Sequence, residues 1–204
     1  MNPKIKICGI TNIEDARQIA LLGVVYLGFI IDVPLSPRSN TIDTASKIIF
    51  ELKKEFSKIK VVGVFVNKSI EDILVAVDLC KFDVLQLHGD ETLEYCQKLK
   101  QHTNLEIWKA VIIKNIEDVE YAQTYVTKVD KILYDSGKGS GTQIDFELLK
   151  NVDVDILAGG LGVENILDAI KTVNPGIVDV NSGVELIPGK KDVRLVKKLL
   201  SIVY

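Results

Sequence analysis

Short apolar runs alternate along the chain with amphipathic stretches at helical spacing. The apolar runs are hydrophobic on both faces, which is typical of parallel strands covered by helices. Helical stretches fill the gaps, so the pattern predicts eight βα units. We expect the strands at Ile5–Cys8, Tyr26–Ile31, Lys60–Val66, Val84–His88, Glu106–Ala110, Lys131–Asp135, Asp155–Ala158 and Ile177–Val180.

Helix start and stop signals support this division. Thr11 with Glu14 and Ser69 with Asp72 have the spacing of capping boxes, and Gly23 follows an apolar run as a helix-ending glycine does. The last helix is predicted from apolar residues at helical spacing, namely Val193, Val196, Leu199, Leu200 and Val203.

The number and length of these units favour one fold. The chain has 204 residues, and eight units of about 25 residues each match a minimal (β/α)8 TIM barrel. An open doubly wound sheet would show a GxGxxG turn after the first strand. That strand instead ends in Cys8-Gly9-Ile10-Thr11, which favours the barrel. No linker, low-complexity tract or charge block interrupts the pattern, so we expect residues 1–204 to form a single compact α/β domain.

Composition narrows the class of protein. The formal net charge is −3, which gives no basis for a nucleic-acid partner or an anionic membrane surface. The longest apolar stretch, around Val24–Ile31, is too short to span a bilayer. Cys8, Cys80 and Cys96 lack the spacing of a disulfide framework or a zinc site. Since the start shows no signal-peptide pattern, we expect a cytoplasmic protein.

The active site of a TIM barrel lies at the carboxyl ends of the strands. Two glycine-containing loops stand there, with Gly159 and Gly160 after the seventh strand and Ser182 and Gly183 after the eighth. Such loops bind phosphate through backbone N–H groups, helped by helix dipoles. Each glycine alone could simply permit a tight turn, but two such loops on adjacent strands favour a phosphate site.

Two further strand-end residues could exchange protons with a substrate. Cys8 ends the first strand and Asp135 ends the sixth, so both project into one mouth. A thiol with a modestly lowered pKa serves as a base near neutral pH, and a buried carboxyl group with a raised pKa serves as an acid. The alternatives are a buried apolar cysteine, and an aspartate that caps a helix or pairs with Lys138.

Other polar residues at this mouth are candidates to hold the substrate. Arg38 could grip a carboxylate with its guanidinium, or lie on the surface. Gln86, His88 and Asp179 also stand at strand ends. The chain has two histidines and no metal-binding pattern, so we expect no metal and no cofactor. Residues 135–142 hold three glycines and could form a lid or a flexible connection.

Taken in order, these motifs resemble the phosphoribosylanthranilate isomerase family of tryptophan biosynthesis, over nearly the whole chain. Each motif is short, but their shared order is specific. The matching segments are Lys6-Ile7-Cys8-Gly9-Ile10-Thr11, Ser36-Pro37-Arg38, Val62–Asn67, Leu85–Glu91, Asp135, Gly139-Ser140-Gly141, Gly159-Gly160-Leu161 with Glu164-Asn165, and Asp179–Glu185 with Pro188–Asp192.

The resemblance implies an enzyme that performs an Amadori rearrangement without a cofactor. Its substrate would be N-(5-phosphoribosyl)anthranilate and its product 1-(2-carboxyphenylamino)-1-deoxyribulose 5-phosphate. The resemblance assigns the base to Cys8, the acid to Asp135, the anthranilate carboxylate to Arg38, and the phosphate to the two glycine-containing loops. Activity should fall at low pH as Cys8 gains a proton, and at high pH as Asp135 loses its own.

Three other functions are compatible with parts of the sequence. A phosphopentose epimerase would need metal-binding histidines, and an indole-glycerol-phosphate synthase would need a catalytic lysine and glutamate. Lys109 is the clear strand-end lysine, and the sequence shows no obvious partner for it. A non-catalytic sensor would need the phosphate loops but not Cys8 and Asp135. In every case the expected partner is a small phosphorylated molecule, and the sequence leaves both a monomer and a homodimer open.

Overall fold

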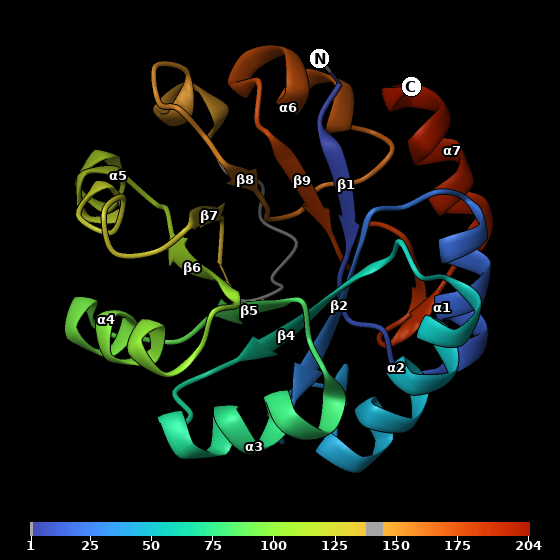
Figure 1. Ribbon diagram of the computed structural model, residues 1–204. Helices are drawn as coiled ribbons and strands as arrows, with labels where there is room; N and C mark the ends of the chain where they lie inside the picture. The colour runs from blue at the N-terminus through green and yellow to red at the C-terminus, as the bar shows by residue number, and fades with distance from the viewer. Residues whose placement is uncertain (1, 138–144) are drawn as a thin grey trace.

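Eight parallel strands close into a barrel in the computed structural model, which describes residues 2–137 and 145–204 (Figure 1). The barrel strands are β1 (Lys4–Ile7), β2 (Tyr26–Ile31), β4 (Lys60–Phe65), β5 (Val84–Leu87), β6 (Glu106–Ile112), β7 (Lys131–Asp135), β8 (Ile156–Leu157) and β9 (Ile177–Val180). Neighbouring strands pair in parallel around the ring, and β1 pairs with both β2 and β9. The chain is therefore a (β/α)8 TIM barrel, and the predicted strands are confirmed to within two residues at each end.

Helices form an outer layer around the strands, as Figure 1 shows. In the described part of the chain the α-helices are α1 (Ile13–Leu21), α2 (Ile42–Glu55), α3 (Ile70–Cys80), α4 (Leu93–His102), α5 (Ile116–Gln123), α6 (Ile166–Val173) and α7 (Val193–Val203). Between β7 and β8 stands a single 3-10 turn, η1 (Phe146–Leu149), where the pattern predicts an α-helix. No helix in the described residues is long and apolar enough to cross a membrane.

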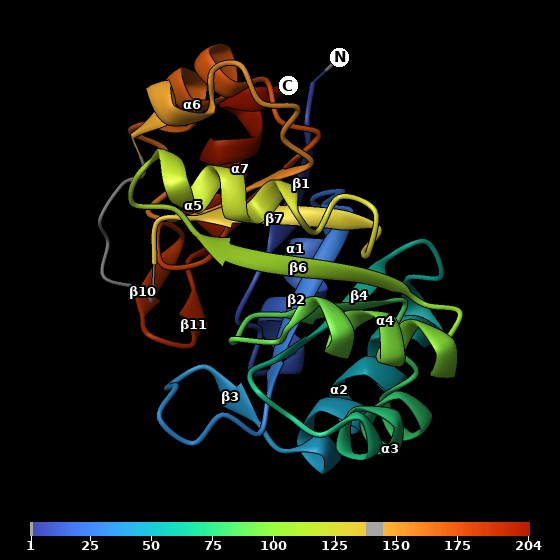
Figure 2. The same ribbon diagram turned by 90° about the vertical axis from the view of Figure 1, so that its left-hand side faces the viewer.

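A two-stranded hairpin precedes α7 and lies at the mouth of the barrel. Its strands are β10 (Glu185–Ile187) and β11 (Lys190–Lys191). Figure 2 shows it at the end of the barrel toward which the strands point. The turn residue Gly189 lies against Pro37, in the loop between β2 and the two-residue strand β3 (Ser39–Asn40). The hairpin thus brings the loops after β2 and β9 together at one side of the mouth.

The barrel interior is filled by side chains. The inner core holds Cys8, Tyr26, Val62, Val64, Val84, Trp108, Ala110, Leu133, Ile156, Ala158 and Ile177. The Trp108 ring, fully buried, packs edge-on against Tyr26 with ring centroids 5.2 Å apart. A second, larger apolar cluster lies between the strands and the helices. Because the interior is packed, ligand chemistry is confined to the mouth.

One predicted helix cap is wrong and two helix signals are confirmed. Helix α1 is capped by Asn12, whose side chain accepts the Asp15 N–H at 2.8 Å, and not by Thr11 with Glu14. The Thr11 hydroxyl instead donates to the Gly189 carbonyl at 2.5 Å, which ties the start of α1 to the hairpin turn. Ser69 caps α3 as predicted, and Gly23 ends α1 with a φ of +83°.

Candidate active site

Cys8 lies at the carboxyl end of β1, where the sequence predicts it. Its N–H donates to the Val180 carbonyl of β9 at 2.9 Å, and its side chain is buried. Burial raises the pKa of the Cys8 thiol above its ordinary value, while the ammonium groups of Lys6 and Lys191 act to lower it. The thiol is therefore enclosed among charged side chains, although its neutral form prevails in the free protein.

Gly9 allows other loops to approach this thiol. Its backbone has a φ of +75°, and a Cβ at this position would lie 2.7 Å from Asn181 Oδ1 and 2.9 Å from Arg38 Cδ. Any larger residue would displace both neighbours. The glycine therefore permits the loop after β2 and the loop after β9 to pack directly beside Cys8.

Arg38 faces the mouth but is already held by a residue from the hairpin. Its Nε donates to Glu185 at 3.0 Å and its Nη2 at 2.7 Å. Glu185 also accepts Lys191 Nζ at 2.8 Å and the Gly189 N–H at 3.1 Å. Although burial opposes it, these hydrogen bonds hold the pKa of Glu185 below its ordinary value. One carboxylate thus lies between two cations, which leaves this rim with an excess of positive charge.

Asp135 is the last residue of β7, across the mouth from Cys8. Its Oδ1 accepts the Gly137 N–H at 2.8 Å, and its Oδ2 lies 3.5 Å from His88 Nε2. Burial raises the pKa of Asp135, against the opposing effect of His88. The raised pKa is what a carboxyl group needs in order to donate a proton.

His88, in the loop after β5, points toward Asp135, and Gln86 of β5 contacts the other side of its ring. His88 Nδ1 lies 3.0 Å from Gln86 Nε2, and burial lowers the pKa of His88. A neutral imidazole then has one N–H and one acceptor to share between Gln86 and Asp135. Gln86 is buried, and its Oε1 has no hydrogen-bond partner among the described residues.

Asp179 is buried next to Lys6, although its strand-end position predicts a residue that lines the mouth. Its Oδ2 accepts Lys6 Nζ at 2.7 Å, and both side chains are buried inside the barrel. Asp179 Oδ1 has no partner in the described part of the chain. Lys6 was not predicted to have a role of its own, so this interior ion pair is a feature that strand-end reasoning missed.

The two glycine-containing loops meet, as predicted. A parallel bridge joins Gly162 to Gly183, directly beyond β8 and β9. Gly159 and Gly160 have φ angles of +97° and +63°, which favour glycine. Ser182 is exposed at the surface of this junction. The loops therefore form one continuous backbone surface at the side of the mouth next to α6.

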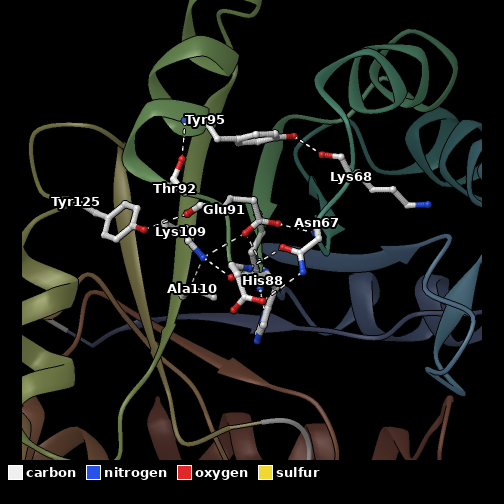
Figure 3. Close-up of polar contacts among 12 residues, drawn as sticks. Asn67, Lys68, His88, Glu91, Thr92, Tyr95, Lys109, Ala110 and Tyr125 are labelled. Carbon is white, nitrogen blue, oxygen red and sulfur yellow. Dashed lines mark hydrogen bonds and ion pairs between the residues drawn. The ribbon is translucent and has the colours of Figure 1, made fainter.

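Lys109 has a buried partner that the sequence did not reveal. Its Nζ lies 3.2 Å from Glu91 Oε2 and donates to the carbonyls of Gly89 and Ala110 at 2.7 and 2.8 Å (Figure 3). The expectation that nothing pairs with Lys109 is therefore wrong. Because these contacts occupy its three donors, the lysine serves to hold the loop and not to meet a substrate.

The same cluster fixes the loop that carries His88. Glu91 accepts the N–H groups of Asn67 at 2.8 Å and Gly89 at 2.9 Å, and the Tyr125 hydroxyl donates to the Glu91 carbonyl at 3.0 Å. Figure 3 shows these side chains converging behind His88 from β5, β6 and the neighbouring loops. A buried, fully bonded anchor of this kind gives His88 a defined position.

Two further predictions from the sequence concern a lid over the site and a metal ion. The predicted lid, residues 135–142, falls mostly outside the described residues. Among the residues that the structure describes, no three His, Cys, Asp or Glu side chains gather in a way that could hold a metal ion.

Comparison with family models and with individual proteins points to the same family. Residues 5–201 match the family model described as N-(5'phosphoribosyl)anthranilate (PRA) isomerase. An N-(5'-phosphoribosyl)anthranilate isomerase from Petrotoga mobilis is 41% identical, over 97% of this chain and 95% of that protein. Another from Trichormus variabilis is 39% identical, over 93% and 92%.

Two solved structures are similar to this chain over nearly its whole length. A phosphoribosyl anthranilate isomerase from Thermotoga maritima superposes with a TM-score of 0.88 at 37% identity, covering 98% of each chain. A phosphoribosyl anthranilate isomerase in complex with reduced 1-(o-carboxyphenylamino)-1-deoxyribulose 5-phosphate gives a TM-score of 0.86 at 36% identity, again over 98% of each chain.

Proposed function

Since the chain belongs to the N-(5′-phosphoribosyl)anthranilate isomerase family and so catalyses that isomerase step of tryptophan biosynthesis, we propose that Cys8 is its base and Asp135 its acid. Protonated Asp135 donates to the ribose ring oxygen, and the ring opens to an iminium ion. Thiolate Cys8 then removes the proton from C2′. The resulting enolamine tautomerises to the ketone, so no electrons leave the substrate.

The remaining mouth residues hold the two ends of the substrate. Arg38 takes the anthranilate carboxylate through the N–H groups that Glu185 leaves free. The loops at Gly159-Gly160 and Ser182-Gly183 take the phosphate through backbone N–H groups. Gln86 and His88 would contact the ribose between these ends, and Asp179 would act on this region from below, through its pair with Lys6. A substrate anchored at both ends presents its C2′ between base and acid.

One observation above all supports these roles. Cys8 and Asp135 come from strands on different sides of the barrel, yet the Lys6–Asp179 pair influences the pKa of both. The two groups therefore share one buried electrostatic environment. A carboxyl group with a raised pKa, across the mouth from a buried thiol, suits a reaction in which one proton is given and another is taken.

The test compares single-atom changes at each position with a matched cysteine elsewhere. Cys8→Ser and Asp135→Asn should each lower kcat by ~10²-fold or more, measured as loss of substrate fluorescence without added metal or nucleotide. Cys80→Ser is the control, because Cys80 is also buried but lies at the end of α3 and contacts the Ile42 carbonyl. Near-normal turnover by folded Cys8→Ser would remove the proposed base.

We also propose that residues 1–204 act as one catalytic domain in the cytoplasm, as a monomer or a homodimer. All three cysteines are free, which suits a reducing compartment. A relative from Thermotoga maritima, 36% identical, is described as dimeric. Light scattering during size-exclusion chromatography would distinguish one copy from two.

A further inference from the structure

Lys6 is a buried charge that the proposed reaction steps do not use. It stands two residues before Cys8 on β1, so both side chains point into the barrel. Its side chain is 0% exposed, and its Nζ lies 2.7 Å from Asp179 Oδ2. Burial alone would lower the pKa of Lys6, but Asp179 and Cys8 together outweigh burial, raise that pKa and keep the lysine protonated. A permanent cation therefore lies inside the barrel beneath the thiol.

Gly28 on β2 provides the space in which Lys6 and Cys8 approach each other. A Cβ built on Gly28 would lie 2.7 Å from Cys8 Sγ and 3.1 Å from Lys6 Nζ. The sulfur and the ammonium therefore lie within about 6 Å of each other, inside the range over which opposite charges shift a pKa. A side chain on β2 would force the two groups apart.

The charges that face Cys8 come from three other groups. Lys6 reaches it from β1, Asp179 from β9 and Lys191 from β11. Lys191 is shared with Glu185, which also holds Arg38. With Glu185 and Arg38 included, this network around the thiol holds three cations and two carboxylates. A thiolate at Cys8 would balance that excess, whereas a neutral thiol leaves it unbalanced.

We propose that Lys6 is a positioning residue that stabilises the Cys8 thiolate, with Asp179 holding the ammonium in place and limiting its effect. The inference rests on the proposed role of Cys8 as the base. When Cys8 takes the C2′ proton, an S–H bond forms, the C–H bond breaks, and its electron pair neutralises the iminium. The sulfur then becomes neutral, and Lys6 remains paired with Asp179. Lys6 thus favours the charged form that reacts, and touches no substrate atom.

Direct titration of the thiol in the free protein tests this idea. The ultraviolet absorbance of the thiolate is followed against pH, with the Cys8→Ser signal subtracted to remove Cys80 and Cys96. In Lys6→Met the pKa of Cys8 should rise by about 1–3 units relative to wild type. In Asp179→Asn it should fall, because the carboxylate opposes the thiolate. A purely structural lysine would not produce shifts of opposite sign.

Two further variants show whether a changed thiol pKa results from the lost charge or from misfolding. Lys6→Met leaves Asp179 buried without a partner, so the double variant Lys6→Met with Asp179→Asn removes both charges and should still show a raised thiol pKa. Lys4→Met is the matched control, since Lys4 lies on the same strand but about 13 Å from Cys8. Its thiol pKa should match wild type.

Enzyme kinetics separate this inference from the assignment of the base. An unchanged thiol pKa in Lys6→Met and in the double variant would overturn the role of Lys6, and leave Cys8 as the base. Full activity in Cys8→Ser would overturn the base itself, even if Lys6 controls the thiol. If both hold, kcat/KM of Lys6→Met near neutral pH should fall by about tenfold for each unit of the pKa rise.

Discussion

The guanidinium of Arg38 meets the carboxylate of Glu185 along one edge, through Nε at 3.0 Å and Nη2 at 2.7 Å, although 147 residues separate them. Among the described residues, Arg38 Nη1 has no hydrogen-bond acceptor. An arginine has five N–H donors in a fixed plane. Glu185 therefore occupies one edge and leaves the opposite edge for an incoming carboxylate.

Loss of the Arg38 guanidinium should weaken substrate binding more than turnover. A charge-assisted hydrogen bond contributes about 1.5–3 kcal/mol, so Arg38→Met should raise KM by roughly 10–100-fold. The same variant should accept the corresponding aniline adduct, which lacks the carboxylate, almost as well as the natural substrate. Steady-state kinetics with both compounds check this. A retained preference for the carboxylate would show that another residue reads it.

The plot of kcat/KM against pH should be bell-shaped, and the structure indicates which residue controls each side. Burial raises the pKa of both Cys8 and Asp135, and a thiol starts from the higher value. Between the two pKa values the pair holds one proton, mostly on sulfur, and the reactive form with that proton on Asp135 is a constant minor fraction. The kcat/KM should therefore fall below the pKa of Asp135 and above that of Cys8.

This assignment reverses the one made from the sequence, which assumed a lowered thiol pKa. Measuring kcat/KM from about pH 5 to about pH 10 in wild type and Lys6→Met distinguishes the two. In the variant the plateau between the limbs should drop, because a higher thiol pKa shrinks the reactive fraction, while the acid limb stays at the same pH. Movement of the acid limb alone would restore the earlier assignment.

The backbone junction under the phosphate loops should tolerate a methyl group on one side only. A Cβ on Gly183 would collide with the Leu161 carbonyl oxygen, whereas a Cβ on Gly162 would meet its nearest neighbour at 3.4 Å. Gly183→Ala should therefore raise the inhibition constant of inorganic phosphate about tenfold, near 1.4 kcal/mol. Gly162→Ala is the matched control. Equal effects in both variants would contradict the asymmetry.

The buried Lys109–Glu91 pair should matter more to stability than an exposed pair. Lys109→Met leaves a buried carboxylate without its cation, so unfolding free energy should fall by about 3–5 kcal/mol in urea titrations. Lys98→Met breaks the exposed pair with Glu94 and should leave the unfolding free energy nearly unchanged, because solvent screens that pair. Adding Glu91→Gln to Lys109→Met should recover part of the loss. Equal stability of the two lysine variants would show that the Asn67 and Gly89 N–H groups stabilise the Glu91 carboxylate without the lysine.

Strand-end reasoning located the mouth correctly because all parallel strands of a barrel end on one side. It placed Cys8, Asp135 and the two glycine loops there from spacing alone. It could not find Glu185 as the partner of Arg38, since no local pattern links residues 147 positions apart. Thr11 was misjudged as a cap because its hydroxyl serves a distant hairpin turn.

Unlike the Arg38 partner, the importance of Lys6 could be recognised from the sequence. A lysine inside a strand that is otherwise apolar on both faces must find a buried counter-ion. Asp179, in the middle of the last apolar run, is the matching acid. What the sequence lacked was the register that makes Lys6 and Asp179 direct neighbours between β1 and β9.

That register also constrains the order of assembly during synthesis. Lys6 leaves the ribosome 173 positions before Asp179 does. Until then β1 carries an ammonium group with no carboxylate to neutralise it in a closed interior. A nascent chain therefore gains little from packing its first strand early, and contacts this distant in sequence form slowly. The charge that the proposed base relies on is thus neutralised only once β9, the last strand of the ring, has been made.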